Sequence, residues 1–209
     1  ASLDLNSPAC YSDDIGLPLI YRDLSGELKV NVPLVNESQL ETSGVDLQVQ
    51  YGIPMEFASS RVSGLGETLQ LSFVLSWLDE YVLDGIDYTD TSGYYNIQGS
   101  FPEWKAVLRL AYDIGPVNVA WVTTYIDDID NQRNIPEFED GGYSSIPSHT
   151  YHDLSAAWAI DETFELSGGI RNLFDKEPPV YENNIDQNTD PSTYDMVGRF
   201  YFAGVRARF

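Results

Sequence analysis

Apolar and polar residues alternate along most of the chain, a periodicity of two that indicates β-strands with unlike faces. In residues 67–77 (ETLQLSFVLSW), every second position from Leu69 to Trp77 is apolar, with Gln70 and Ser72 among the residues between them. The same alternation predicts strands over residues 45–51, 104–112, 117–125, 152–160, 164–174 and 201–209. We therefore expect about seven strands, each near the length that a tilted strand needs to cross a bilayer.

The connections between these strands are alternately short and long. Residues 113–116 (DIGP) and 161–163 (DET) are tight turns, whereas long polar stretches cover residues 79–100, 127–148 and 175–195. This order places all the long loops at one end of an antiparallel sheet. A transmembrane β-barrel has short turns towards the periplasm and long loops outside, so the pattern favours an up-and-down barrel over a soluble sandwich.

Aromatic residues gather near both ends of the predicted apolar face. Trp77, Trp104 and Tyr125 lie near the long loops, and Tyr51, Tyr112, Phe164 and Phe209 lie near the short turns. Trp104 and Tyr112 lie about 26 Å apart along a strand, which a tilt near 40° reduces to about 20 Å of membrane depth. The spacing matches two aromatic girdles, although a sandwich core would also place aromatic residues at every second position.

Composition narrows the class of protein. The net charge of -22 leaves no basic patch for nucleic acid, and a hydrophobic content of 43% with 13% aromatic residues indicates a folded chain. We interpret the acidic residues as a solvated surface, and cation binding by some of them is the alternative. No apolar run is long enough for a membrane helix. Because the first residues resemble no signal peptide, we expect a mature product or a piece of a longer chain.

Candidate chemistry is sparse. The segment 148–153 (SHTYHD) supplies His149, His152 and Asp153, but His152 falls on the outward face, and residues three apart in a strand point to opposite faces. Neither a hydrolase nor a metal site is expected there, and no phosphate loop, CxxC or EF-hand spacing occurs. The chain is predicted to be no enzyme, with no cofactor. Cys10 has no internal disulfide partner and is either a free thiol or paired elsewhere.

Tyrosines on the long loops are the candidate ligand contacts. They are Tyr88, Tyr94, Tyr95, Tyr143 and Tyr181. Tyrosine offers a rigid, amphipathic surface suited to sugars or aromatic ligands, although some of these rings could simply pack the loops together. Acidic loops disfavour an anionic siderophore, so we expect an oligosaccharide or another neutral substrate.

Several motifs resemble one known family. The segments 166–179 (LSGGIRNLFDKEPP) and 194–209 (YDMVGRFYFAGVRARF) resemble the C-terminal end of TonB-dependent outer-membrane receptors. The segments 40–51 and 99–117 are similar to earlier strands of that family. Residues 7–36, with Cys10, resemble the cysteine-bearing outer loop of one branch. The resemblance covers essentially the whole chain.

That resemblance implies a barrel of 22 strands, plugged by an N-terminal domain, in the outer membrane of a Gram-negative bacterium. On this basis residues 1–34 are an extracellular loop region, and residues 35–209 are the last barrel strands, with the plug and earlier strands absent. The implied function is TonB-dependent import of a bulky nutrient, an oligosaccharide or else a siderophore-like chelate. The implied partners are membrane lipid, the nutrient, the rest of the receptor and the TonB complex, reached through the absent N-terminal region.

The last strand combines apolar residues with arginines. Arg206 and Arg208 are expected to face a hydrated interior, staying hydrated or pairing with acids such as Glu165 and plug carboxylates. The resemblance implies that the terminal aromatic, Phe209, is the signal read by the barrel-assembly machinery.

Two other architectures remain open. Residues 27–33 (ELKVNVP) could supply one more strand to a complete eight-stranded barrel with a structural or adhesive role. The irregular segment 1–23 is a poor first strand for such a barrel. A soluble β-sandwich that binds carbohydrate is the other alternative.

Overall fold

The computed structural model describes residues 20–22, 28–30, 39–56, 66–92, 99–130, 145–180 and 189–208, all in strands, turns or irregular segments. The strands are β1 (Ile20–Arg22), β2 (Leu28–Val30), β3 (Leu40–Pro54), β4 (Glu67–Leu83), β5 (Ile86–Asp87), β6 (Trp104–Ile114), β7 (Val117–Ile126), β8 (His149–Ala159), β9 (Phe164–Arg171) and β10 (Phe200–Ala207). No helix among these residues is long and apolar enough to cross a membrane.

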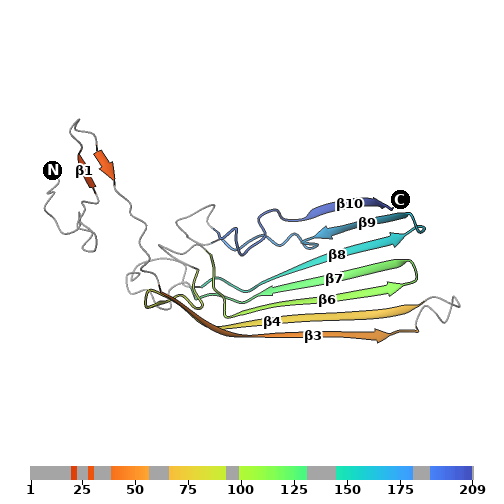
Figure 1. Ribbon diagram of the computed structural model, residues 1–209, viewed down its shortest axis with the longest axis horizontal. Helices are drawn as coiled ribbons and strands as arrows, with labels where there is room; N and C mark the ends of the chain where they lie inside the picture. Colours follow the sequence, from red (N-terminus) through yellow and green to blue (C-terminus); the bar gives the residue numbers. More distant parts are fainter. Residues whose placement is uncertain are drawn as a thin grey trace. The chain divides into compact units, whose positions relative to one another are not determined.

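The chain divides into two units, Ala1–Ser38 and Gln39–Phe209. The second unit is one antiparallel sheet with the strand order β10-β9-β8-β7-β6-β4-β3, and the short β5 pairs with β4 beside this path (Figure 1). This arrangement confirms an all-β, up-and-down sheet of about seven main strands. In the first unit, β2 pairs with β1. The described part of the segment 27–33, which is β2, therefore belongs to a separate two-stranded sheet.

The register assigns the predicted apolar residues of the paired strands to the same face. One row of paired positions crosses seven strands and consists of Tyr51, Leu71, Leu110, Trp121, Leu154, Ile170 and Tyr201. Paired residues share a face, and residues two apart along a strand do as well. The sheet therefore has an apolar face, which carries these residues, and a polar face, which carries Gln70, Ser72 and Arg109.

Aromatic side chains on the apolar face form two bands that run obliquely across the strands. The upper band, which is the one nearer the long loops, begins at the paired Trp77 and Trp104 and ends at Tyr201. From Trp77 to Tyr201 there are five steps between neighbouring strands, and the band moves six residues towards the short turns. The lower band, nearer the short turns, shifts by the same six residues over five strand steps, from Tyr51 to Phe164. At about 3.3 Å per residue and 4.8 Å between strands, this slope corresponds to a strand tilt of about 40°, the tilt of transmembrane barrels.

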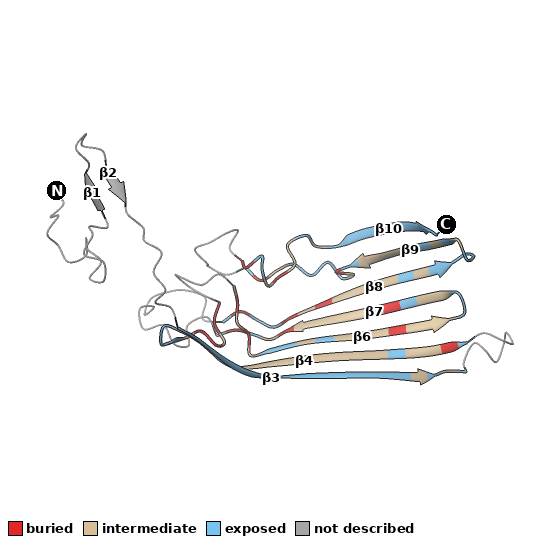
Figure 2. Ribbon diagram, in the orientation of Figure 1, coloured by how far each residue is buried: buried red, intermediate tan, exposed pale blue. Residues whose placement is uncertain are grey.

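The sheet has a single layer and does not close. Within the described residues of the second unit no further sheet covers the apolar face, where Val45 is 58% and Val205 is 70% exposed. The terminal strands β3 and β10 are exposed along most of their length, because each pairs with only one neighbour (Figure 2). A sandwich would bury these residues between two sheets, so the structure does not support that alternative.

Several strand boundaries differ from the prediction, and β3 begins at Leu40 and β8 at His149, before the expected residues 45 and 152. The strand expected over 164–174 ends at Arg171, because Asn172 adopts a φ of 47° and begins a turn. β4 extends to Leu83, beyond its predicted end, and reverses into β5 through Asp84 and Gly85. Both turn residues have positive φ, as an Asp-Gly hairpin turn requires. The long polar stretch that starts at residue 79 therefore begins as an extended hairpin.

The turn after β9 joins three strands. The Asn172 side chain accepts a hydrogen bond from the Lys176 N–H (2.8 Å) and donates one to the Lys176 carbonyl (2.9 Å). The Asn172 N–H donates to Asp153 on β8 (2.8 Å), and Asp175 accepts the N–H of Arg199 just before β10 (2.8 Å). The turn carries Phe174 onto the apolar face, where its ring meets Trp121 and His152.

A glycine in β9 permits close packing on the polar face. A Cβ at Gly169 would lie 2.6 Å from the Leu154 carbonyl oxygen and 2.6 Å from the Phe202 ring. Phe202 is paired with Gly169 across the β9–β10 boundary. The aromatic ring thus covers the glycine, an arrangement that pins the register of two strands.

Replacing Gly169 tests this packing. We expect Gly169→Ala to destabilise the folded protein by about 1–3 kcal/mol, because the added methyl overlaps both backbone and ring. Gly52→Ala is the matched control, since Gly52 lies on the same register row with no atom within 4 Å of its Cβ position. The measurement is the temperature at which the full protein loses its compact form on gel electrophoresis. Equal midpoints for the two variants would contradict the packing role.

Candidate functional site

Three hydrogen-bond donors meet on one register row of the polar face. Gln50 on β3 pairs with Ser72 on β4, and Ser72 pairs with Arg109 on β6. Side chains paired in this way lie about 5 Å apart at their Cβ atoms, so their polar ends can reach one ligand. None of the three has a polar partner among the described residues.

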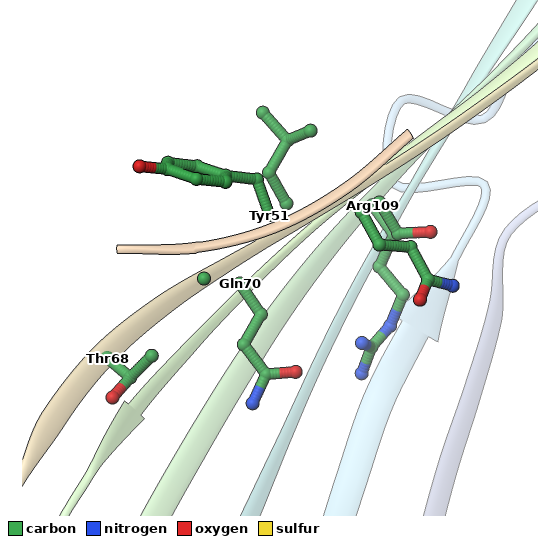
Figure 3. Close-up of a pocket in the computed structure, with 8 residues that line it drawn as sticks. Tyr51, Thr68, Gln70 and Arg109 are labelled. Atoms are coloured by element: carbon green, nitrogen blue, oxygen red, sulfur yellow. The ribbon is translucent and has the colours of Figure 1, made fainter. Parts of the chain in front are cut away.

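A hollow of about 450 Å³ surrounds this row (Figure 3). Its lining consists of Gln50, Tyr51, Gly52, Thr68, Gln70, Leu71, Ser72 and Arg109. Figure 3 shows the Gln70 and Arg109 side chains on one side of the strands and the Tyr51 ring on the other. The hollow is therefore a polar site on the polar face, bordered at its edge by an aromatic residue of the opposite face.

The nearest carboxylate on the polar face of β6 is already engaged. Asp113 accepts hydrogen bonds from the side-chain amides of Gln70 (2.8 Å) and Asn118 (2.6 Å). It lies four residues from Arg109 on the same strand, a distance of about 13 Å. No carboxylate in the described part of the chain is within ion-pair distance of Arg109, which is an exposed residue.

The arginines of the last strand behave differently. Arg206 lies 3.4 Å and Arg208 lies 3.5 Å from the two oxygens of Glu165. These ion pairs confirm the expected pairing with Glu165. Both arginines are about two-thirds exposed, at 64% and 65%, so each pair contributes at most about 1 kcal/mol.

At the long-loop end, the segment before β10 packs on other parts of the fold. Tyr194 joins a buried cluster with Ile126, Ile129, Ile146 and Tyr151. The Tyr194 ring also meets the His149 ring edge-on, with centroids 5.3 Å apart. Residues 189–194 therefore cover the polar face where β7 and β8 meet their loops.

Asp190 organises this covering segment. Its carboxylate is buried and accepts hydrogen bonds from the Ser192 N–H (2.8 Å) and hydroxyl (2.5 Å). Burial favours a higher pKa for Asp190, but the hydrogen bonds from Ser192, Thr193 and Ser100 outweigh it and hold the pKa below the usual 3.8. The segment is thus held by a charged carboxylate at neutral pH.

Most predicted ligand-contact residues lie outside the described residues. These are Tyr94, Tyr95, Tyr143 and Tyr181, and Phe209 and Cys10 lie outside them as well. Tyr88 is described and is only 4% exposed, with its ring 6.5 Å from that of Phe101. A ligand contact by Tyr88 stays a prediction and requires this loop to open.

The two histidines point to opposite faces, as their spacing predicts. His149 pairs with Ile126 on the polar face, and His152 pairs with Thr123 on the apolar face. The Thr123 hydroxyl accepts the Trp121 indole N–H (2.9 Å) and lies in hydrogen-bond contact with His152 Nδ1 at 3.0 Å. Asp153 accepts the Asn172 N–H instead of contacting either imidazole. The structure does not bring these residues together as a catalytic or metal-binding group.

The row of Gln50, Ser72 and Arg109 was not singled out in the sequence. The sequence does contain a signal for these residues, because all three occupy polar positions in the alternating pattern of strands that were correctly predicted. Their alignment depends on the register between strands, which the alternation within each strand does not specify.

The charged state of Asp190 predicts a pH dependence. Because the folded-state pKa lies below 3.8, its contribution is complete above the unfolded pKa and disappears as pH falls through the folded value. We expect the stability difference between the wild-type protein and its Asp190→Asn variant to be constant from pH 7 to about 5 and to shrink below about 4. Thermal unfolding in detergent across this range measures it. A difference that grew on acidification would contradict the assignment.

Comparison with known proteins identifies the architecture. The family described as TonB dependent receptor-like, beta-barrel matches residues 9–173. No curated protein and no solved structure matches the chain. Members of this family are transporters of the outer membrane and not enzymes. The apolar face of the sheet is therefore its lipid face and the polar face its lumen face, and the chain belongs to the TonB-dependent receptor β-barrel family.

Proposed function

We propose that this chain forms the last strands of a receptor that imports a bulky nutrient across the bacterial outer membrane, using energy supplied through TonB. The observation that carries the proposal is the two-faced sheet, in which a lipid face with two oblique aromatic bands backs a polar lumen face. Closing the sheet requires further strands beside β3 and β10, and the rest of the same receptor would supply them.

An oligosaccharide is the substrate that we favour. Side-chain amides and hydroxyls line the lumen hollow, and such groups hydrogen-bond to sugar hydroxyls. The loop residues Tyr94, Tyr95, Tyr143 and Tyr181, with Tyr88 after loop opening, would add flat apolar contacts. A siderophore-like chelate is the second candidate, and the acidic character of the chain disfavours it when the chelate is anionic.

Uptake measurements test the transport proposal. We expect cells that produce the full receptor to accumulate a labelled oligosaccharide only when TonB is present. Receptor-deficient cells and cells with the receptor but without TonB are the two controls. Uptake that is equal with and without TonB would contradict an energised receptor and favour a passive or adhesive barrel.

Removal of Phe209 tests the proposed assembly signal. We expect deletion of this residue to lower the amount of heat-modifiable receptor in the outer membrane several-fold, because the assembly machinery would lose its terminal aromatic. Phe209→Tyr is the matched control and should assemble normally. Quantitative blotting of outer-membrane fractions measures the effect, and normal assembly of the deletion variant would refute the role of Phe209.

A further inference from the structure

The lumen hollow has an excess of hydrogen-bond donors over acceptors. Arg109 supplies five N–H groups and no acceptor, and the Gln50 amide and Ser72 hydroxyl supply further donors. The neighbouring amide of Gln70 is already bonded to Asp113. An excess of donors around a fixed positive charge is complementary to an anion.

The surroundings of Arg109 differ from those of the two arginines in the last strand. The protein has 33 acidic and 11 basic residues, and Arg206 and Arg208 share the carboxylate of Glu165. Arg109 has no such partner in the described part of the sheet. The next residue of its row, Val122 on β7, is apolar, so no acid lies directly beside it on either neighbouring strand.

We propose that Gln50, Ser72 and Arg109 form a binding site for a carboxylate in the lumen. The planar guanidinium matches a carboxylate through two parallel hydrogen bonds, a geometry that lysine cannot offer. Ser72 and Gln50 extend the donor row from β4 to β3, so a second acceptor next to the carboxylate can bind there. A sugar acid has both features, since its ring hydroxyls flank the carboxylate.

The carboxylate has two possible sources with the same chemistry. It is carried either by a free substrate, such as an acidic sugar, or by an acidic side chain of another segment of the receptor within the lumen. The inference rests on the proposed function only in requiring the polar face to line a lumen. Its test measures binding in detergent without TonB, so failure of uptake and failure of this site are separate results.

The experiment uses the full receptor in detergent, with glucuronate as the probe and glucose at equal concentration as the neutral control. Calorimetric titration and the thermal midpoint are recorded for wild type, Arg109→Gln and Arg109→Lys. Arg206→Gln is the matched variant, because it removes the same charge elsewhere on the lumen face. If the site takes a free carboxylate, glucuronate binds and glucose does not. Arg109→Gln then weakens glucuronate binding about tenfold or more, Arg109→Lys has a smaller effect, and Arg206→Gln binds normally.

If a carboxylate of the receptor itself occupies the site, the wild type does not bind glucuronate. Arg109→Gln then lowers the thermal midpoint without ligand more than Arg206→Gln does, and high salt reduces the difference. Arg109→Lys lowers the thermal midpoint less than Arg109→Gln does, because it keeps the positive charge. This difference distinguishes the loss of a charge pair from simple misfolding. The proposal is overturned if wild type and Arg109→Gln have the same glucuronate affinity and the same salt-dependent midpoint.

Discussion

The backbone hydrogen bonds between neighbouring strands are the constraint on which the other features depend. In a hydrocarbon layer the N–H and C=O groups of a strand find partners only on adjacent strands, so the pairing must be continuous. Because side chains alternate, that pairing also decides which residues meet lipid, and a slip of one residue would exchange the two faces. The β3–β4 irregularity lies between Ser43 and Gly44, before the first lipid-facing pair of Val45 and Trp77. The register shift therefore lies outside the paired rows in which lipid-facing and lumen-facing residues alternate.

The oblique aromatic bands explain why the strands have unequal lengths. A tilted strand at one side of the sheet passes beyond the upper band, whereas β9 ends close to that band at Arg171. β4 runs six residues past Trp77 to Leu83, about 20 Å of strand, and there supports β5. The ring of Tyr81 stacks on Phe101 beyond the band, with centroids 4.3 Å apart. The β4–β5 hairpin therefore extends the sheet beyond the upper band, at the end where the long connections begin.

The sequence predicted the strands and their faces because alternation is a local property of each strand. It overextended β9 because Phe174 continues the apolar phase, although Asn172 forms a turn that presents the same ring to the same face. It missed the β4–β5 hairpin, although Asp84 and Gly85 carry a recognised turn signal. The donor row at Arg109 depends on pairing between distant segments, which no local pattern encodes. The site was therefore less predictable than the fold.

The charge distribution limits how an anion can reach Arg109. The chain's acidic excess repels a small polyanion, but screening confines exposed charges to about 8 Å at physiological ionic strength. A bulky, mostly neutral ligand with a single carboxylate loses little by passing such a surface and gains a charge-assisted hydrogen-bond pair in the lumen. A side chain delivered from within the receptor avoids the surface altogether. Both routes allow Arg109 to lie at mid-strand in an acidic chain without an ion-pair partner among the described residues, whereas a free polyanion would be repelled before reaching it.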